Sequence, residues 1–276
     1  MRGAPMAVAS CPERTRIAPP REAIHVIPIL MYHSIAEQSE PYLRRWTVTP
    51  DAFLEHVTAM VESRRTPLTI TQLAEALRGA RPLPARPMAI TFDDGYRDTI
   101  AAASMLAGCE IASTTYITTG FLDRAGMLTT ADVGELSSCG PLIEVGAHGI
   151  SHRRMDELAD DELRAEASGS RSVLEEIAQA RTLSFAYPHG SHDHRSVAAV
   201  RDAGYTSAVA VKNALSHSGD DVFALARVTI EAHTSTATVR AALDGTLRMA
   251  PRGELWRTRG YRQLRRWRRA ARSRSS

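Results

Sequence analysis

The sequence predicts an α/β fold, a distorted or incomplete (β/α) barrel of about seven parallel strands. Short apolar runs alternate with segments of helical periodicity from residue 24 to about residue 232. This alternation is typical of parallel strands joined by crossover helices. Polar residues also follow several of the apolar runs directly, as they do at the active rim of such barrels. An open doubly wound sheet is the alternative fold.

The first two helices are expected from their start and stop signals. A helix is predicted over residues 49–63, because Thr49 suits the N-cap and Pro50 the first helical position. A second helix is predicted over residues 69–79, where a threonine again precedes the apolar period and Gly79 ends it. The apolar positions of the first helix share one face: Phe53, Val57, Met60 and Val61.

The remaining elements follow from run length and periodicity. Strands are expected where short runs rich in apolar and β-branched residues occur, and helices where the apolar period lengthens. The expected strands are 24–32, 87–92, 112–118, 142–146, 183–188, 206–211 and 225–230. The further expected helices are 98–108, 131–138, 159–180 and 195–203.

Composition divides the chain into three parts. Residues 1–22 are rich in Pro, Arg and Ala without an apolar period, which predicts a disordered leader. Residues 23–250 form the expected folded domain. Residues 251–276 form a basic tail, which contains ten Arg and a single Glu between positions 252 and 274. This local charge of +9, against +3 for the whole chain, leaves the preceding residues at −6, so the high pI does not indicate a nucleic-acid partner.

The basic tail has an amphipathic pattern that suits an anionic membrane surface. Its aromatic and apolar residues fall on one side of a helix: Trp256, Tyr261, Leu264 and Trp267. A helix docked on the acidic body, a disordered tail and nucleic-acid contact are the alternatives. With three scattered cysteines and a leader too short in apolar residues for a signal peptide, a cytoplasmic protein is expected, peripheral at the inner face of the membrane if the tail binds lipid.

Reactive side chains cluster directly after four of the expected strands. Asp93 and Asp94 follow residues 87–92, and His148 follows residues 142–146. Two further clusters obey the same rule: Tyr32 and His33, and Tyr187, Pro188 and His189. Because the carboxyl ends of parallel strands share one rim, residues far apart in sequence are expected to meet there.

Two adjacent carboxylates are tolerated if a cation neutralises one while the other stays free to accept a proton. His148 and His152 are four residues apart, so both imidazoles can face the same point. With Asp94 they make a two-histidine, one-carboxylate site for a divalent ion, most simply Zn²⁺, with Co²⁺, Ni²⁺ and Fe²⁺ as alternatives. Asp93 is then the base. An exposed acidic turn and two unrelated histidines are the alternative reading of the same residues.

At these residues the chain resembles the polysaccharide deacetylases of carbohydrate esterase family 4, which have the NodB-homology fold. TFDDG, residues 91–95, matches the first motif of the family, and HGISH, residues 148–152, matches the second, H-[ST]-x-x-H. Gly149 stands where Ser or Thr is usual, which leaves Ser151 as a candidate hydroxyl. The resemblance covers roughly residues 24–232. It implies that Asp94, His148 and His152 hold the metal, that Asp93 is the general base, and that acetamide hydrolysis releases acetate and an amine.

A general acid must protonate the leaving amine. The family's late Leu-x-His motif is not found, since His233 has a different context. Instead ILMYHSI, residues 29–35, resembles the first strand of the biofilm exopolysaccharide deacetylases, in which the strand order is permuted. That resemblance implies that His33 is the acid. A buried histidine satisfied by the backbone is the alternative.

FAYPHG, residues 185–190, occupies the place of the third motif, Arg-x-Pro-Tyr, but lacks its arginine. The resemblance implies substrate or oxyanion contacts at Tyr187, Pro188 and His189, which a main-chain N–H can make without a particular side chain. Arg227 is predicted to support the base in place of the missing arginine, with a surface salt bridge as the alternative. The fourth motif, with its tryptophan, is not found.

The resemblance therefore implies a metal-dependent enzyme that removes the N-acetyl group from an N-acetylhexosamine unit of a polysaccharide, an oligosaccharide or a lipid-linked sugar. One alternative is a metal amidohydrolase that acts on a small non-sugar or natural-product amide. The other is a catalytically silent relative that binds carbohydrate. An N-acetylated sugar is the expected partner, and the oligomeric state is left open.

Overall fold

The computed structural model describes residues 25–247. The predictions of a disordered leader over residues 1–22 and of a membrane-binding tail over residues 251–276 lie outside this range. Within the described range, no helix combines the length and apolar character needed to cross a bilayer.

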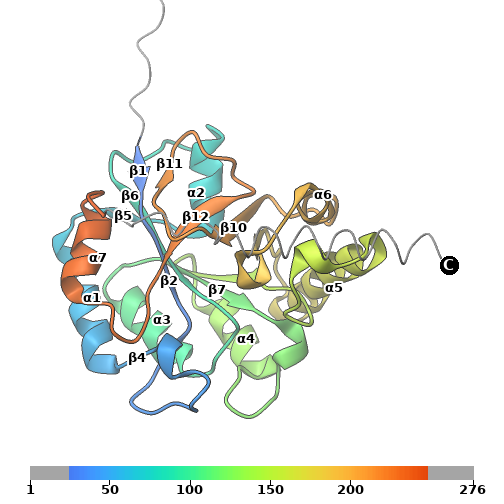
Figure 1. The fold of residues 1–276 in the computed structure, drawn as a ribbon, viewed down its shortest axis with the longest axis horizontal. Helices are drawn as coiled ribbons and strands as arrows, with labels where there is room; N and C mark the ends of the chain where they lie inside the picture. Colours follow the sequence, from blue (N-terminus) through green and yellow to red (C-terminus); the bar gives the residue numbers. More distant parts are fainter. Residues whose placement is uncertain (1–24, 248–276) are drawn as a thin grey trace, which may run out of the picture.

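Seven parallel strands close into a barrel surrounded by helices, which confirms the predicted fold class (Figure 1). The ring closes where β2 pairs with β6, from Ile29 opposite Ala89 to Tyr32 opposite Phe92. In order around the barrel the strands are β2 (Ile29–Tyr32), β12 (Leu225–Thr229), β10 (Ser207–Val211), β9 (Ser184–Ala186), β8 (Ile143–Ala147), β7 (Ser113–Ile117) and β6 (Pro87–Phe92).

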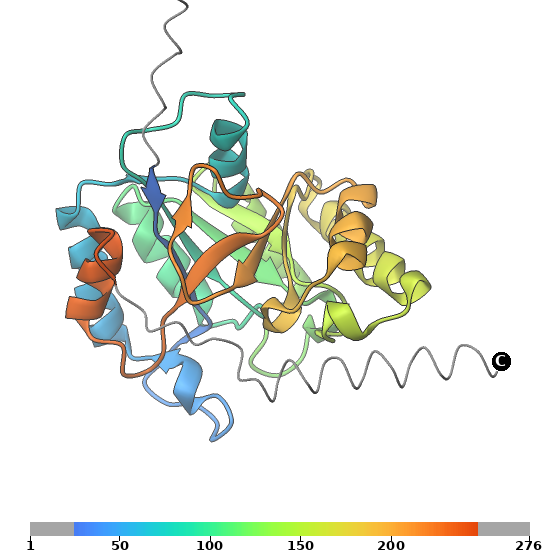
Figure 2. The same ribbon diagram turned by 45° about the horizontal axis from the view of Figure 1, so that its top comes forward.

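Helices surround the barrel, with α2 at its amino end, and α1 and α7 lie side by side in both ribbon views (Figures 1 and 2). The α-helices are α1 (Pro50–Glu62), α2 (Ile70–Leu77), α3 (Thr99–Gly108), α4 (Thr130–Ser138), α5 (Asp160–Ala178), α6 (His194–Asp202) and α7 (Thr236–Leu243). In residues 25–247, short 3-10 helices span Arg44–Trp46, Thr119–Phe121, Met155–Glu157 and Pro188–Gly190. Small pairings add β1 (Val26–Ile27) to β11 (Ser216–His217), β3 (Ser34–Ile35) to β4 (Thr47–Val48), and β5 (Thr66–Pro67) to β6.

The residues predicted to start the first two helices cap them as expected. The Thr49 side chain accepts a hydrogen bond from the Ala52 N–H at the start of α1. Thr69 forms a capping box with Gln72 at the start of α2. One expectation is wrong, because Val61 is 53% exposed and lies off the packed face of α1. Helix α7 was not predicted.

The apolar core has two layers. The larger cluster lies between the strands and the helices and contains residues such as Tyr32, Phe92 and Phe185. A smaller cluster contains the residues that alternate with these along the strands, including Ile29, Ala89 and Leu225, and therefore fills the barrel itself. Residues from α2 join this inner cluster, so the barrel is plugged with apolar side chains near the amino ends of its strands. Polar residues lie at the carboxyl ends of the strands.

Candidate active site

The two adjacent carboxylates diverge directly after β6. The Asp93 N–H donates to the Tyr32 carbonyl at 3.0 Å, which continues the pairing of β6 with β2. Asp94 has a left-handed backbone with φ 73°, and Gly95 follows with φ 88°. This sharp change of direction separates neighbouring side chains that would otherwise repel each other.

Asp93 is paired with Arg227, a residue of β12. The two terminal nitrogens of the Arg227 guanidinium, Nη1 and Nη2, donate to the two oxygens of Asp93, at 2.6 and 2.7 Å. Arg227 is 0% exposed and also donates to Thr91 Oγ1 at 3.0 Å, so the surface salt bridge considered from the sequence is excluded. Burial favours the neutral carboxyl, but Arg227 outweighs it, with help from His148, and lowers the pKa of Asp93. Asp93 is therefore ionised and fixed in orientation.

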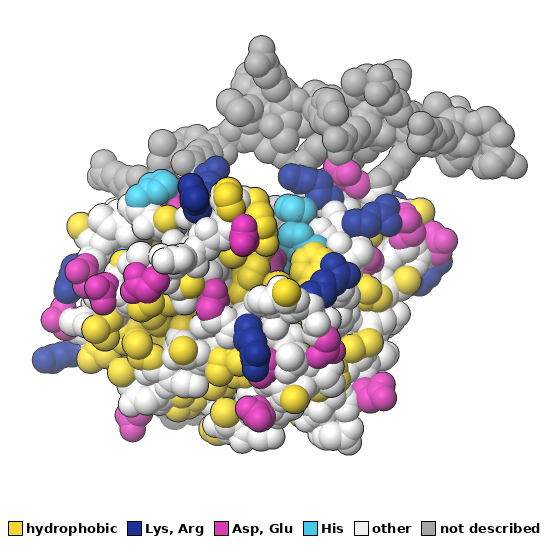
Figure 3. Space-filling view, turned by 90° about the horizontal axis from the view of Figure 1, so that it is seen from below, with side chains coloured by type: hydrophobic (Ala, Val, Ile, Leu, Met, Phe, Trp, Pro, Cys, Tyr) yellow, Lys and Arg dark blue, Asp and Glu magenta, His cyan; other side chains and the backbone are white. Residues whose placement is uncertain are grey.

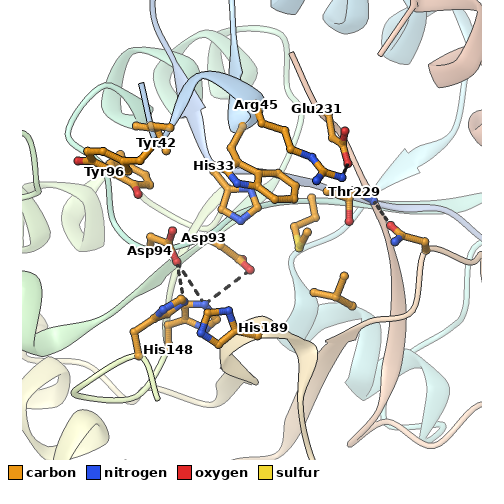
Figure 4. Close-up of a pocket in the computed structure, with 16 residues that line it drawn as sticks. His33, Tyr42, Arg45, Asp93, Asp94, Tyr96, His148, His189, Thr229 and Glu231 are labelled. Atoms are coloured by element: carbon orange, nitrogen blue, oxygen red, sulfur yellow. Dashed lines mark hydrogen bonds and ion pairs between the residues drawn. The ribbon is translucent and has the colours of Figure 1, made fainter. Parts of the chain in front are cut away.

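Asp94, His148 and His152 come together as the sequence predicted. Their ligand atoms all lie within 4.8 Å of one another. Asp94 Oδ1 lies 3.1 Å from His152 Nε2 and 3.4 Å from His148 Nε2, and it has no partner with hydrogen-bond geometry. Figure 4 shows the side chains of Asp94 and His148 pointing toward each other. Two imidazoles and a carboxylate thus surround one point.

The tautomer of His148 shows that this point suits a cation. His148 Nδ1 lies 2.8 Å from the Ala186 carbonyl oxygen, which can only accept, so Nδ1 carries a proton. In neutral His148 the Nε2 lone pair then faces the carboxylate oxygen of Asp94, and only a proton or a metal ion between them makes this arrangement favourable. Burial opposes the charge on His148, but Asp93 and Asp94 outweigh it and raise its pKa. Burial also opposes the charge on Asp94, yet the two histidines hold its pKa well below the usual range.

The three residues therefore fit a divalent ion with two nitrogen ligands and one oxygen ligand. Two histidines and a carboxylate, with positions left open, form a common hydrolytic metal site. Among the described residues this is the one group of three or more such side chains with ligand spacing.

His33 lies at the end of β2, on the opposite side of the aspartates from His148 and His189 (Figure 4). Its ring packs against the Trp46 ring with 5.1 Å between centroids. Its Nδ1 is buried without a hydrogen-bond partner, so the backbone-satisfied histidine considered from the sequence is excluded. Burial lowers the pKa of His33, although Asp94 and Asp93 oppose this. The other acid considered, His233, is 80% exposed and lies 3.6 Å from Glu231.

Of the third-motif residues only His189 lines the cavity. Its ring lies 4.5 Å from the ring of His152, and burial, together with His152 and Arg154, lowers its pKa to about 4. The substrate or oxyanion contact predicted for Tyr187 is wrong, because Tyr187 does not line the cavity and its N–H donates to the Val209 carbonyl. Tyr187 is fully buried in the outer layer and donates to the Phe223 carbonyl, because side chains alternate along β9 and Tyr187 falls on the same face as Phe185. Pro188 is also buried and does not line the cavity.

The cavity above these residues has a volume of about 360 Å³. Figure 3 looks onto this face, where histidine side chains lie in a hollow bordered by hydrophobic residues. One wall of the cavity is formed by the stacked side chains of Arg45 and Trp46, which were not predicted from the sequence. The Arg45 guanidinium lies 4.7 Å from the Trp46 ring centroid and pairs with Glu231 at 2.7 Å. An aromatic residue beside a predicted acid could have been noticed, but no spacing rule connects Trp46 to His33.

The comparisons with known proteins agree with this geometry. Residues 80–208 match the polysaccharide deacetylase family. A Bacillus subtilis protein named provisionally as the polysaccharide deacetylase YxkH is 24% identical over 219 residues, which cover 79% of this chain and 76% of that protein. The poly-beta-1,6-N-acetyl-D-glucosamine N-deacetylase of Escherichia coli K12 is 32% identical over 68 residues, 25% of this chain and 10% of that enzyme.

Solved structures show the same fold. The Streptococcus pyogenes deacetylase PplD, in complex with acetate, superposes with a TM-score of 0.72 at 22% identity, over 82% of this chain and 100% of that chain. IcaB from Ammonifex degensii gives a TM-score of 0.66 at 19% identity, over 81% of this chain and 98% of that chain. The matched region contains the aspartate pair, the two histidines and His189. This chain therefore contains a polysaccharide deacetylase domain.

Proposed function

We propose that this protein is a metal-dependent N-deacetylase that hydrolyses the acetamide of an N-acetylhexosamine unit in a polysaccharide, an oligosaccharide or a lipid-linked sugar. The observation that carries the proposal is the division of labour between the two aspartates: Asp94 faces two imidazoles, whereas Asp93 is bound by Arg227. This difference supports a metal-binding role for Asp94 and a proton-transfer role for Asp93.

Asp94, His148 and His152 are the residues that would hold the ion. A divalent ion at such a site supplies Lewis acidity towards a carbonyl oxygen and makes a water molecule more acidic. Zn²⁺ is the ion we expect, and Co²⁺, Ni²⁺ and Fe²⁺ suit the same ligands.

Asp93 is the proposed general base. Its pKa is lowered, so it is ionised at neutral pH and ready to take a proton from water. Arg227 binds both of its oxygens and leaves each with a further lone pair, which fixes the direction in which the carboxylate accepts. Because Asp93 Oδ2 lies 3.8 Å from His148 Nε2, the accepted proton stays beside the metal ligands.

The main-chain N–H of His189 is the proposed oxyanion donor. His189 has a left-handed backbone with φ 57°, and its N–H finds no acceptor among residues 25–247. A main-chain donor that is free before the reaction can stabilise charge that develops on the acetamide oxygen. With its pKa near 4, the His189 imidazole is neutral at pH 7 and adds no positive charge.

His33 is the proposed acid for the leaving nitrogen. It lies across the aspartates from His148 and is covered by Trp46 (Figure 4). Since its pKa is lowered by burial, we propose that His33 gains its proton during the reaction cycle and does not store it beforehand.

Release of acetate tests the proposal. The wild-type protein, loaded with Zn²⁺, is incubated with a panel of N-acetylated hexosamine oligomers and with small non-sugar acetamides. We expect acetate from the sugars. Asp93→Asn should keep the metal and lose about 10²- to 10⁴-fold in turnover, the usual contribution of a general base. Asp202→Asn, an exposed position on α6, is the matched control and should change neither property.

The outcomes separate the alternatives. Acetate from the small amides alone would favour the non-sugar amidohydrolase. A folded protein that binds sugar but neither binds metal nor releases acetate would favour the silent relative. Full activity in Asp93→Asn would remove Asp93 as the base.

A further inference from the structure

The two histidine ligands stand at the ends of an irregular segment, residues 148–152. His148 continues β8, but the chain then turns through Gly149 with φ 76° and reaches His152 with φ 57°. A left-handed backbone is unfavourable for a histidine unless its surroundings impose it. The position of the His152 imidazole therefore depends on whatever holds this segment.

The carboxylate of Glu166 holds it. Glu166 lies on α5 and is only 8% exposed. It accepts hydrogen bonds from the Ile150 N–H at 2.6 Å and the Ser151 N–H at 3.0 Å, and its second oxygen accepts from the Ser151 hydroxyl. One buried carboxylate thus takes three donors from the two residues that directly precede His152. Such charge-assisted bonds are the strong ones among protein hydrogen bonds.

Three glycines let the segment lie this close to its supports. A Cβ at Gly149 would lie 2.9 Å from Glu166 Oε2, and a Cβ at Gly169 on α5 would lie 2.7 Å from Ile150 Cδ1. On the other side, a Cβ at Gly120 would lie 2.4 Å from the Ile150 carbonyl oxygen, which accepts from the Gly120 N–H. The segment is therefore clamped from two sides, and Gly149, which replaces the usual hydroxyl residue, leaves room for the Glu166 carboxylate.

We propose that Glu166 is a positioning residue of the metal centre, which sets the spacing between the His148 and His152 imidazoles through the main chain that it binds. The inference rests on the proposed metal site. Glu166 touches neither the cavity nor the ligand atoms, so it acts through residues 150 and 151. Groups that orient metal ligands in this way typically change metal affinity by about 10- to 100-fold when they are replaced.

Zinc affinity of the folded, metal-free protein tests the proposal, measured by competition with a chromogenic chelator. Glu166→Gln keeps the side-chain shape but replaces one oxygen acceptor by a donor that faces the segment. We expect its Zn²⁺ dissociation constant to rise by about 10- to 100-fold. The Co²⁺-loaded variant should also show a changed visible spectrum, since the spectrum reports the arrangement of the ligands. Glu176→Gln, an exposed position on the same helix, is the control and should match the wild type.

A second variant keeps the test decisive if Glu166→Gln does not fold. Gly149→Ala adds a methyl group against the Glu166 carboxylate and should also weaken Zn²⁺ binding relative to Glu176→Gln. If the folded variants bind Zn²⁺ and shape the Co²⁺ spectrum as the control does, with lowered melting temperatures alone, Glu166 is a purely structural residue and the inference is wrong. If the wild type itself binds no metal, the proposed function fails instead.

Discussion

Strand β8 carries a polar side chain near each end of the barrel, and the two ends differ in how completely these groups are paired. Glu144 and His148 are four residues apart, so both point to the same face of the strand. At the amino end, Glu144 accepts from the Thr71 N–H and hydroxyl and from the Thr114 hydroxyl at 2.9 Å. At the carboxyl end, His148 faces Asp94 with no hydrogen bond between them.

The difference separates a structural polar group from a functional one. Burial raises the pKa of Glu144, while the hydrogen bonds from Thr71 oppose this, and the protein itself supplies all the donors. Oδ1 of Asp94, by contrast, is buried and has no hydrogen-bond donor among residues 25–247, so a cation would satisfy it. Incomplete pairing at the carboxyl end therefore supports the metal site that we propose there.

The largest expected effect comes from breaking the Asp93–Arg227 pair. Arg227→Met should destabilise the metal-free protein by about 3–5 kcal/mol at pH 7, because it leaves Asp93 as an unpaired buried charge. Turnover should fall at least about 100-fold, since the base loses its orientation. The measurement is chemical denaturation with an activity assay. Arg153→Met, which breaks the exposed pair with Glu162, is the control and should cost less than about 1 kcal/mol.

The loss of stability caused by Arg227→Met should decrease as the pH falls. In the wild type the pKa of Asp93 is depressed, so its stabilising contribution is present above the unfolded value of about 3.9 and is lost as pH falls through the folded value. Without Arg227, burial raises that pKa, and protonation relieves the penalty as pH falls. The difference in free energy of unfolding between the wild type and Arg227→Met should therefore decrease from pH 7 to pH 5. An increase in this free-energy difference as pH falls would contradict the conclusion that Asp93 is ionised in the folded protein.

A smaller effect is expected at the opposite end of the barrel. Glu144→Gln replaces one acceptor oxygen by a donor beside Thr71 and Thr114, so it should cost about 1–3 kcal/mol of stability. Metal affinity and turnover should stay at the wild-type level, because Glu144 lies at the other end of β8. A Glu144→Gln protein that lost metal would show that the two ends are not independent.

Much of the site could be read from the sequence because strand alternation fixes which residues face the barrel. Asp93 lies two residues beyond Thr91, and Arg227 two beyond Leu225, so both point inward where a base and its partner can meet. The same rule would have corrected Tyr187, which shares the outward face of Phe185. That contact was predicted from a motif position without regard to the alternation.

Contacts between segments that no short-range pattern connects could not be predicted. Trp46 reaches His33 from a 3-10 helix after a polar loop, and Glu166 reaches residues 150 and 151 from the middle of α5. Their side chains are ordinary for a loop and a helix, and only the packing of α5 against the loop gives Glu166 its partners. Helix α7 was not predicted, although Ser235 caps it through the Thr238 N–H just as Thr49 caps α1 through the Ala52 N–H.

The most direct test of the account is a Zn²⁺ titration of the metal-free wild-type protein followed by calorimetry, beside Asp94→Ala and the control Asp202→Ala. We predict one ion per chain for the wild type and the control, and loss of that binding in a folded Asp94→Ala protein. Binding that survives the loss of Asp94, or a wild type that takes up no ion, would contradict the claim that Asp94, His148 and His152 form a metal centre.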